Sequence, residues 1–234
     1  MKKIGVLGGM SWESSLEYYR IMNETVKKEL GQKHSANCLM YSFDFHDVEV
    51  LQRQNKWDEL TKLMVDEAMN LKNAGAEFIV IATNTMHLMA PAIEKATGLK
   101  VLHIAKATGN EIIRRGLKKI LLLGTKFTME GTFYRDILTS MGIETLIPND
   151  FDREIIHDII YHELILGDIN ESSKNTYIKI IEKMALEGAE GVILGCTEIP
   201  LLIHEGDVSI DVLDTTAIHA IAAVTEAIKR KAVE

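Results

Sequence analysis

The chain has 234 residues, of which 47% are hydrophobic and 26% charged, with a formal net charge of −8. A chain of this length and apolar content can bury a substantial core, as one large domain or two small ones. Its acidic balance gives no electrostatic footprint for nucleic acid and repels anionic lipid surfaces. We therefore expect small-molecule partners, with neither a nucleic acid nor a membrane among them.

The cysteine content and the opening segment place the chain in a reducing compartment. Only Cys38 and Cys196 occur, and their spacing fits neither a disulfide framework nor a thiolate metal site. The apolar run within residues 1–10 is too short for a signal peptide and is interrupted by glycines. No segment approaches the length of a membrane span. These features predict a soluble cytoplasmic protein without a bound metal.

Short apolar runs alternate with amphipathic stretches along the whole chain. Strands are expected at residues 4–7, 39–43, 78–82, 101–104, 120–123, 144–147, 191–194 and 212–213. Helices are expected at residues 14–30, 57–73, 128–140, 152–166, 172–187 and 216–230. Gly75 and Gly188 stand where a helix must stop before the next strand. This alternation predicts an α/β fold whose parallel sheet is covered by helices on both faces.

The same pattern occurs twice. Residues 2–9 read KKIGVLGG and residues 118–125 read KKILLLGT, while residues 75–85 read GAEFIVIATNT and residues 188–198 read GAEGVILGCTE. The two pairs are offset by 116 and 113 residues. We interpret this as two similar parallel-sheet halves related by a pseudo-twofold axis, residues 1–112 and 113–234. The boundary is expected near residues 109–116, with the last helix packing against the first half.

The duplicated pattern aligns Thr83 with Cys196, each at the end of an expected strand. Ligands of open α/β sheets bind beyond the carboxyl ends of the strands. We therefore expect Thr83 and Cys196 to face each other across a central cleft that holds the active site. Other polar clusters that follow strands are residues 8–11, 44–53, 125–128 and 196–198.

The segment GGMSWESS at residues 8–15 admits three interpretations. A glycine pair that opens a helix can cradle a phosphate, but the full GxGxxG pattern and a P-loop lysine are both missing. A tight strand-to-helix turn with Ser11 as the N-cap is favoured over that nucleotide site. The glycines also permit a flexible flap over the cleft.

Cys196 is the candidate reactive group. An isolated cysteine is most often a small apolar core residue, which is the interpretation for Cys38 within its strand. Cys196 instead follows Gly195 and precedes Thr197, where a helix is expected to begin. A thiol at a helix N-terminus has a lowered pKa and is available as a base or nucleophile.

The aligned loop at residues 83–85 consists of three small polar residues. They are either ordinary helix caps or donors that hold a carboxylate, and the match to Cys196 favours the second interpretation. His87 lies one turn beyond Thr83 and is a candidate to line the cleft. His103 and His219 receive no assignment, because no spacing implies a metal triad.

Three of these segments together resemble the aspartate/glutamate racemase family: GVLGGMS at residues 5–11, TNTMH at 83–87 and GCTE at 195–198. The resemblance spans essentially the whole chain. It implies an amino-acid racemase that needs no pyridoxal phosphate or other cofactor, with two acid–base residues on opposite faces of the substrate α-carbon. Carried over, these are Thr83 and Cys196. The substrate-binding residues implied are Met10, Gln52, Asn84, Thr85, Thr125, Thr128 and Thr197.

The chain departs from the family pattern at the groups that set chemistry and specificity. Thr83 replaces the first cysteine, and a hydroxyl is a far weaker acid than a thiol. Gln52 and Arg53 are the nearest candidates for a missing arginine, and Ile165 stands where the family has a lysine. A subgroup with threonine at the first position acts on L-aspartate and L-glutamate, and the segment at residues 44–54 resembles it.

The resulting expectation is a racemase of aspartate, glutamate or related amino acids that favours L-substrates and forms a homodimer. Two alternatives stay open. One is a single-cysteine decarboxylase or isomerase of the same superfamily, and the other is an amino-acid-binding protein that lost catalysis when the first cysteine became Thr83.

Overall fold

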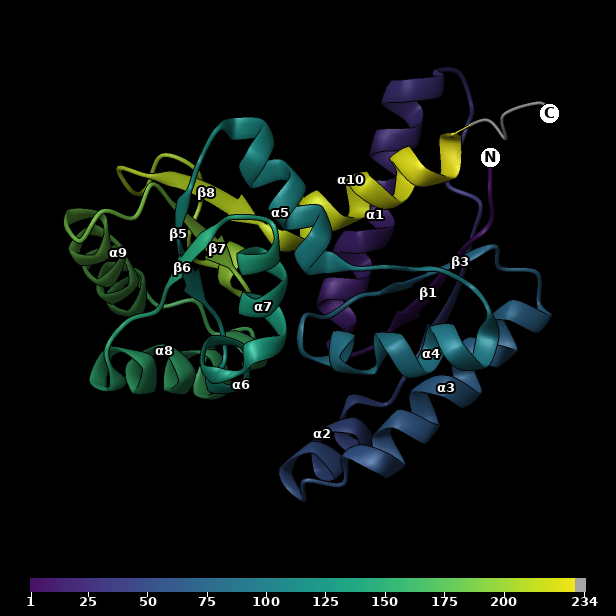
Figure 1. Cartoon of the computed structure of the whole chain (residues 1–234), viewed down its shortest axis with the longest axis horizontal. Helices are drawn as coiled ribbons and strands as arrows, with labels where there is room; N and C mark the ends of the chain where they lie inside the picture. Colours follow the sequence, from purple (N-terminus) through teal and green to yellow (C-terminus); the bar gives the residue numbers. More distant parts are fainter. Residues whose placement is uncertain (230–234) are drawn as a thin grey trace. The chain divides into compact units, whose positions relative to one another are not determined.

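The computed structural model describes residues 1–229, which form two compact units with one four-stranded parallel sheet each (Figure 1). The first unit comprises Met1–Ile104 together with the residues from His219 onward, and the second comprises Ala105–Ile218. The prediction of two similar parallel-sheet α/β halves is confirmed.

In the first unit the sheet order is β2-β1-β3-β4. Its strands are β1 (Ile4–Gly8), β2 (Cys38–Ser42), β3 (Phe78–Ile81) and β4 (Val101–Leu102). Its helices are α1 (Trp12–Leu30), α2 (Phe45–Arg53), α3 (Trp57–Asn73), the 3-10 helix η1 (Thr85–Met89), α4 (Ala90–Thr97) and most of α10 (Thr215–Ile228).

The second unit repeats this arrangement in the order β6-β5-β7-β8. Its strands are β5 (Lys119–Leu123), β6 (Glu144–Leu146), β7 (Gly191–Leu194) and β8 (Asp211–Asp214). Its helices are α5 (Ile104–Arg115), α6 (Lys126–Glu130), α7 (Thr132–Ser140), α8 (Asp150–His162), η2 (Leu164–Leu166), α9 (Glu171–Leu186) and η3 (Ile199–Leu201). Strands β1 to β4 thus correspond in order to β5 to β8.

Each unit is completed by a helix that follows the other unit's last strand. Helix α5 follows β4 of the first unit but lies in the second, while α10 follows β8 and lies in the first from His219 onward. The expected boundary at residues 109–116 falls within and just beyond α5 rather than in a linker. Gly109 lies inside this helix and packs so closely on Met141 that a Cβ would come within 2.5 Å of the methionine sulfur.

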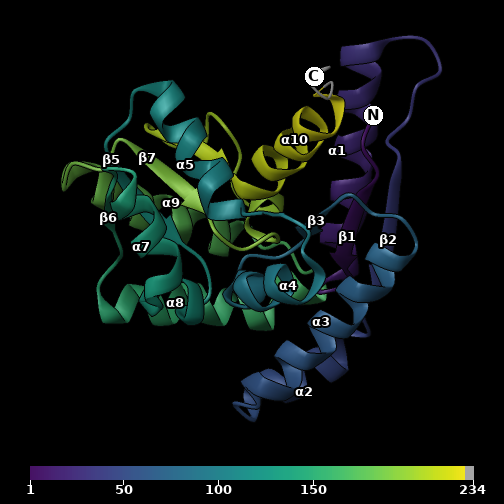
Figure 2. The same ribbon diagram turned by 45° about the vertical axis from the view of Figure 1, so that its right-hand side comes forward.

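Both faces of the first sheet are buried, as the continuous apolar strands predict. Leu7, Ile79 and Ile81 point to the face covered by α3 and α4. Alternate residues, among them Val6 and Val80, point to the opposite face, where α1 and α10 pack with their own apolar side chains. Figure 2 shows α1 and α10 together beside β1, with α3 on the other side.

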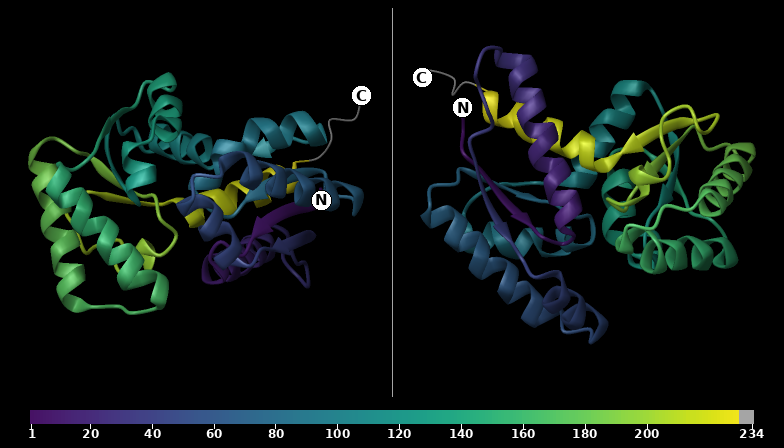
Figure 3. Two further views of the ribbon diagram at one scale, coloured as in Figure 1. Left: turned by 90° about the horizontal axis from the view of Figure 1, so that it is seen from below. Right: turned by 180° about the vertical axis from the view of Figure 1, so that it is seen from behind.

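In the second unit one face of the sheet packs against α8 and α9, which Figure 3 shows side by side. Leu121 and Leu123 of β5 and Val192 and Leu194 of β7 contribute to this fully buried cluster. The second sheet is therefore also firmly packed, and it fixes the positions at which the loops at its carboxyl edge begin.

The chain departs from the expected elements mainly where helices are short. Helices α2, α4 and α5 were not expected, and the helix expected over residues 128–140 is broken at Gly131 into α6 and α7. A Cβ at Gly131 would lie 2.5 Å from the Phe127 carbonyl oxygen. Gly75 and Gly188 end their helices with φ of +96° each, as predicted. The helix expected to reach Arg230 ends at Ile228 (α10), and Arg230 itself lies outside the described residues.

Candidate active site

Thr83 and Cys196 occupy equivalent positions in the two units. Each is the second residue beyond its strand, which is β3 for Thr83 and β7 for Cys196. Both strands lie at the same place in their sheets, between the first strand of the unit and the last. The alignment made from the repeated sequence is therefore correct in topology, and both residues stand at a carboxyl edge, where α/β sheets bind ligands.

In the first unit the turn after β1 is rigidly packed. Gly9 has φ of +86°, and a Cβ there would lie 2.3 Å from the Phe43 carbonyl oxygen. Its backbone N–H donates to the Ser15 hydroxyl at 2.7 Å. The Ser14 hydroxyl lies 3.3 Å from the Ala82 carbonyl oxygen and so links this turn to the Thr83 loop. The residues at 8–11 are buried, which favours the interpretation as a tight strand-to-helix turn.

The Thr83 loop is fastened through its backbone by His87. The His87 Nδ1 atom lies 2.8 Å from the Thr83 carbonyl oxygen, and the Ile104 backbone N–H donates to His87 Nε2 at 3.1 Å. A carbonyl oxygen only accepts, so Nδ1 carries the ring proton and Nε2 has none. Burial, followed by the neighbouring His219 and His103, lowers the pKa of His87 well below its usual range. His87 is therefore a neutral structural anchor with both ring nitrogens engaged.

A second neutral histidine lies against the first. The His219 Nε2 atom is 2.6 Å from the Leu102 carbonyl oxygen, and its Nδ1 is 2.7 Å from the Tyr18 hydroxyl. Nε2 must therefore donate, so the Tyr18 hydroxyl donates to Nδ1. Burial lowers the pKa of His219 to about 4. The rings of His87 and His219 lie 5.4 Å apart at their centroids.

The expected binding residues of the first unit are all buried, but they lie on different elements. Asn84 and Thr85 are buried in the loop itself, and Met10 packs in the same apolar cluster as Met86. Gln52 is also buried, but it lies in the last turn of α2. At 1.5 Å per residue, this places it about 10 Å along the helix axis from the first residue of α2.

Neither position at which the family carries a cation supplies a free positive charge here. Arg53 pairs with Glu49 at 2.6 Å and its side chain is 70% exposed. In the second unit Ile165 packs against the apolar core, so this position supplies no charge.

In the second unit two glycines bring the loops after β5 and β7 into contact. A Cβ on Gly124 would lie 3.0 Å from the Thr128 side chain, and one on Gly195 would lie 2.5 Å from the Leu123 carbonyl oxygen. The Thr125 and Thr128 hydroxyls are 3.4 Å apart. The structure therefore places the predicted Thr125 and Thr128 beside the Cys196 loop.

The expected lowering of the Cys196 pKa is wrong. The helix directly after Cys196 is η3, a single 3-10 turn that begins at Ile199, so the loop does not start the α-helix that the sequence led us to expect. Burial raises the pKa of Cys196 well above its usual range, and the Glu198 carboxylate raises it further. The resting form of this residue is the neutral thiol.

Glu198, which the sequence placed in the polar segment at residues 196–198 without a binding role, is a further functional candidate. It is 6% exposed, and its Oε2 accepts hydrogen bonds from the Cys196 thiol at 2.9 Å and from the Thr197 hydroxyl at 3.0 Å. The signal was present in the GCTE segment, because residues two apart in an irregular turn can fold back on one another. The other cysteine, Cys38, lies half-buried in β2 against the apolar core.

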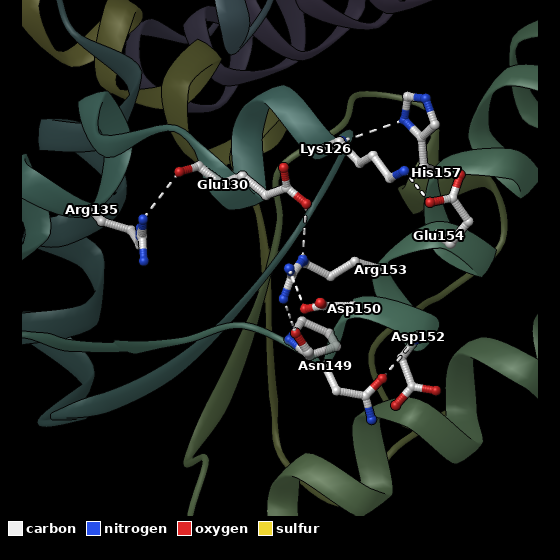
Figure 4. Close-up of polar contacts among 10 residues, drawn as sticks. Lys126, Glu130, Arg135, Asn149, Asp150, Asp152, Arg153, Glu154 and His157 are labelled. Atoms are coloured by element: carbon white, nitrogen blue, oxygen red, sulfur yellow. Dashed lines mark hydrogen bonds and ion pairs between the residues drawn. The ribbon is translucent and has the colours of Figure 1, made fainter.

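An ion-pair network fastens the loop of Thr125 to α8 (Figure 4). Lys126 pairs with Glu154, and its backbone N–H donates to His157 Nδ1 at 3.4 Å. Arg153 pairs with Glu130 at 3.1 Å, which joins the end of α6 to the same helix. The carboxylates of both pairs are largely exposed, so water screens the charges and each pair contributes little to stability. Lys126, the cation next to Thr125, is therefore already neutralised within its own unit.

Two properties of the described residues bear on the expected metal and membrane interactions. Within residues 1–229 no three or more His, Cys, Asp or Glu side chains gather into a possible metal site. In the same part of the chain, no helix combines the length and apolar character needed to cross a membrane.

These features define a class: an α/β protein of two topologically equal units, each with a polar loop after its third strand, of which the second carries the Cys196 thiol. The model of the Asp/Glu/Hydantoin racemase family matches residues 7–223. The chain belongs to this family and is an isomerase.

Individual relatives agree with the family assignment. A candidate Asp/Glu racemase from Yersinia pestis is 51% identical, with a TM-score of 0.93 over 98% of this chain and 100% of that one. An aspartate racemase homologue from Pyrococcus horikoshii is 38% identical, with a TM-score of 0.86 over 98% and 100%. The broad specificity amino-acid racemase RacX of Bacillus subtilis is 24% identical over 95% of this chain and 96% of that protein.

Proposed function

We propose that this chain racemises aspartate, glutamate or a related amino acid without a cofactor, using Cys196 and Thr83 on opposite faces of the substrate α-carbon. The observation that carries the proposal is the equivalent position of these residues, two places beyond β3 and β7. The similarity to proteins named Asp/Glu racemase, aspartate racemase homologue and amino-acid racemase supports the substrate class.

In the proposed reaction Cys196 removes the α-proton of the L-substrate, and the Thr83 side supplies a proton to the opposite face. The negative charge that develops on the α-carbon and its carboxylate needs preorganised donors. Asn84, Thr85 and Thr197 fill this role in the proposal. Their backbones and side chains belong to the two loops that carry the reacting groups.

The remaining expected contacts are assigned by their positions. Thr125 and Thr128 adjoin the Cys196 loop, and Met10 packs beside the Thr83 loop, so they shape the site around the substrate backbone. Gln52 is assigned to the substrate side chain. We also propose that the protein is a cytoplasmic homodimer. Size-exclusion chromatography with light scattering tests the dimer.

Thr83 makes the reaction asymmetric. A threonine hydroxyl is a much weaker acid than a thiol, so it does not exist as a resting base at neutral pH. The D-substrate, whose α-proton faces Thr83, is therefore expected to have the lower kcat, and the Haldane relation at an equilibrium constant of one then requires a proportionally lower KM. The equilibrium remains one to one, because a catalyst changes rates and not the relative free energies of enantiomers.

The decisive experiment is proton NMR of L- and D-amino acids in deuterated buffer with the wild-type protein. Loss of the Cα proton signal, followed by appearance of the opposite enantiomer on a chiral column, is the expected result for aspartate or glutamate. Binding without exchange would identify a catalytically inactive binding protein, and release of CO2 from malonates would identify a decarboxylase. Either result would refute the proposal.

A further inference from the structure

The Glu198 carboxylate turns back onto the thiol of its own loop. Its Oε2 lies 2.9 Å from Cys196 Sγ and 3.0 Å from the Thr197 hydroxyl oxygen. Glu198 is 6% exposed and Cys196 is only partly exposed, so water solvates neither group well. Two acidic groups in such contact do not readily ionise together, because their negative charges repel and each loses hydration.

We infer that Cys196 and Glu198 share a single proton across the neutral pH range, and that Glu198 accepts the thiol proton when Cys196 acts as a base. This inference rests on the proposed racemase function. Glu198 acts through Cys196 and is a positioning residue that also holds a proton.

The proton count closes over one turnover. Glu198 takes the Sγ proton, which leaves a Cys196 thiolate beside a neutral carboxylic acid. The thiolate then forms an S–H bond with the α-proton of the L-substrate, and the C–H electron pair stays on the α-carbon. A proton from the Thr83 side completes the D-product. Solvent then removes the extra proton from the Cys196–Glu198 pair and returns one to the Thr83 side.

This arrangement resolves the conflict between the chemistry and the raised pKa of Cys196. A lone thiol of that kind would need hydroxide from solution to become a base, and its active fraction would rise tenfold per pH unit. In a pair that keeps one proton, the thiolate–carboxylic acid form is a constant fraction of the total. The exchange rate should therefore be independent of pH wherever the pair carries one proton.

The other ionisable groups near the pair do not provide this proton. Tyr177 of α9 lies within electrostatic reach of Cys196, Glu198 and Glu163, and its hydroxyl donates to the Ile156 carbonyl oxygen at 3.3 Å. Burial raises the pKa of Tyr177 well above its usual range, so it stays neutral. Glu163, at the end of α8, accepts from Ser173 at 2.5 Å.

The test compares wild type with Glu198→Gln, Glu198→Asp and the exposed control Glu205→Gln. We measure Cα proton exchange of L-aspartate and L-glutamate in deuterated buffer from about pH 6 to 8.5. Wild type and Glu205→Gln should show a flat profile. Glu198→Gln keeps an oxygen that accepts from the thiol but cannot take its proton, so its rate should rise about tenfold per pH unit. Glu198→Asp retains a carboxylate and should keep a flat profile at a lower rate.

A second readout follows Cys196 directly, by iodoacetamide alkylation against pH in a Cys38→Ser background. Removing the like charge of Glu198 should move the alkylation midpoint of Glu198→Gln to lower pH. The inference thus requires a more acidic thiol together with the loss of the flat exchange profile. A merely structural role for Glu198 produces neither change.

The outcomes separate the two proposals. If wild type exchanges and Glu198→Gln keeps a flat profile, the shared proton is refuted while the racemase function stands. A wild-type rate that already rises tenfold per unit, with a faster Glu198→Gln, shows that Glu198 only suppresses the thiolate and also overturns the inference. If wild type exchanges no amino acid, the racemase proposal fails. The alkylation midpoints then decide whether Cys196 and Glu198 are coupled.

Discussion

Acid should destabilise the first unit through the buried neutral His219. Burial lowers the pKa of this histidine from 6.5 to about 4 in the folded protein, whereas the unfolded chain keeps the ordinary value. At a pH between these two pKa values, His219 is protonated in the unfolded state and neutral in the folded state. Above about pH 6.5, protonation of His219 therefore does not reduce the free energy of unfolding, whereas this free energy falls as the pH is lowered toward 4. At 1.36 kcal/mol per pKa unit, the loss is about 3 kcal/mol.

The comparison variant removes the titration while filling the same space. His219→Gln combined with Tyr18→Phe retains an amide donor for the Leu102 carbonyl oxygen and leaves no tyrosine hydroxyl without its acceptor. At pH 7 this variant should be less stable than wild type by about 1–3 kcal/mol, because two buried hydrogen bonds have been altered. Toward pH 4 the difference should shrink by about 3 kcal/mol, since only wild type pays for protonation.

Urea unfolding followed by tryptophan fluorescence measures this unit alone. Both tryptophans of the chain, Trp12 and Trp57, lie in the first unit. The matched control is the exposed His34→Gln, whose stability should follow that of wild type at every pH. Parallel curves for wild type and the double variant between pH 7 and 4 would refute the assignment of His219 as a buried neutral group.

Three further variants test the site, and Cys38→Ser serves as a control. Thr83→Cys should raise the rate of Cα exchange of D-substrates at least tenfold, and a gain confined to L-substrates would contradict the assigned faces. Cys196→Ser should keep the circular dichroism spectrum and lose L-substrate exchange by about 10²–10⁴-fold, whereas Cys38→Ser should keep turnover per folded molecule and lose only about 1 kcal/mol of stability. Gly195→Ala should cost about 1–3 kcal/mol in urea unfolding, because its Cβ would meet the Leu123 carbonyl oxygen at 2.5 Å; unchanged stability would show that the loop can move.

The fold was predictable because its strongest signals are local and repeated. Buried strands such as β1 and β5 are continuous apolar runs, and Gly75 and Gly188 end helices at matching places. Helices α2 and α4 were missed because segments of nine and eight residues carry little periodicity. The last helix, expected to pack against the first half, does so through the fully buried Ala220, Ala223 and Ala227 of α10.

The positions of the candidate site residues could be predicted from the sequence, but their protonation states and hydrogen-bond partners could not. The repeat alone aligned Thr83 with Cys196, and the strand ends located both. The state of the thiol depends on how the backbone turns after Gly195, and that turn brings Glu198 back to Cys196 instead of starting an α-helix. From the sequence, His87 was a candidate to line the cleft. In the structure both of its ring nitrogens are hydrogen-bonded to backbone groups, one in Thr83 and one in Ile104.

The two loops share a topology but differ in their capacity to hold a proton, and this difference has a kinetic consequence. Cys196 has Glu198 as a partner at 2.9 Å, whereas the Thr83 hydroxyl has no hydrogen-bond partner among residues 1–229. The Cys196–Glu198 pair exchanges a proton with solvent in each proposed turnover, so it can return a deuteron to the face from which the proton left. Delivery from the Thr83 side is slower because the hydroxyl is a weak acid. An L-substrate should therefore exchange its Cα proton several-fold faster than it inverts, which parallel NMR and chiral chromatography measure. Equal initial rates of exchange and inversion would show instead that the far face holds an acid as effective as a thiol. Thr83→Cys should bring the two rates together.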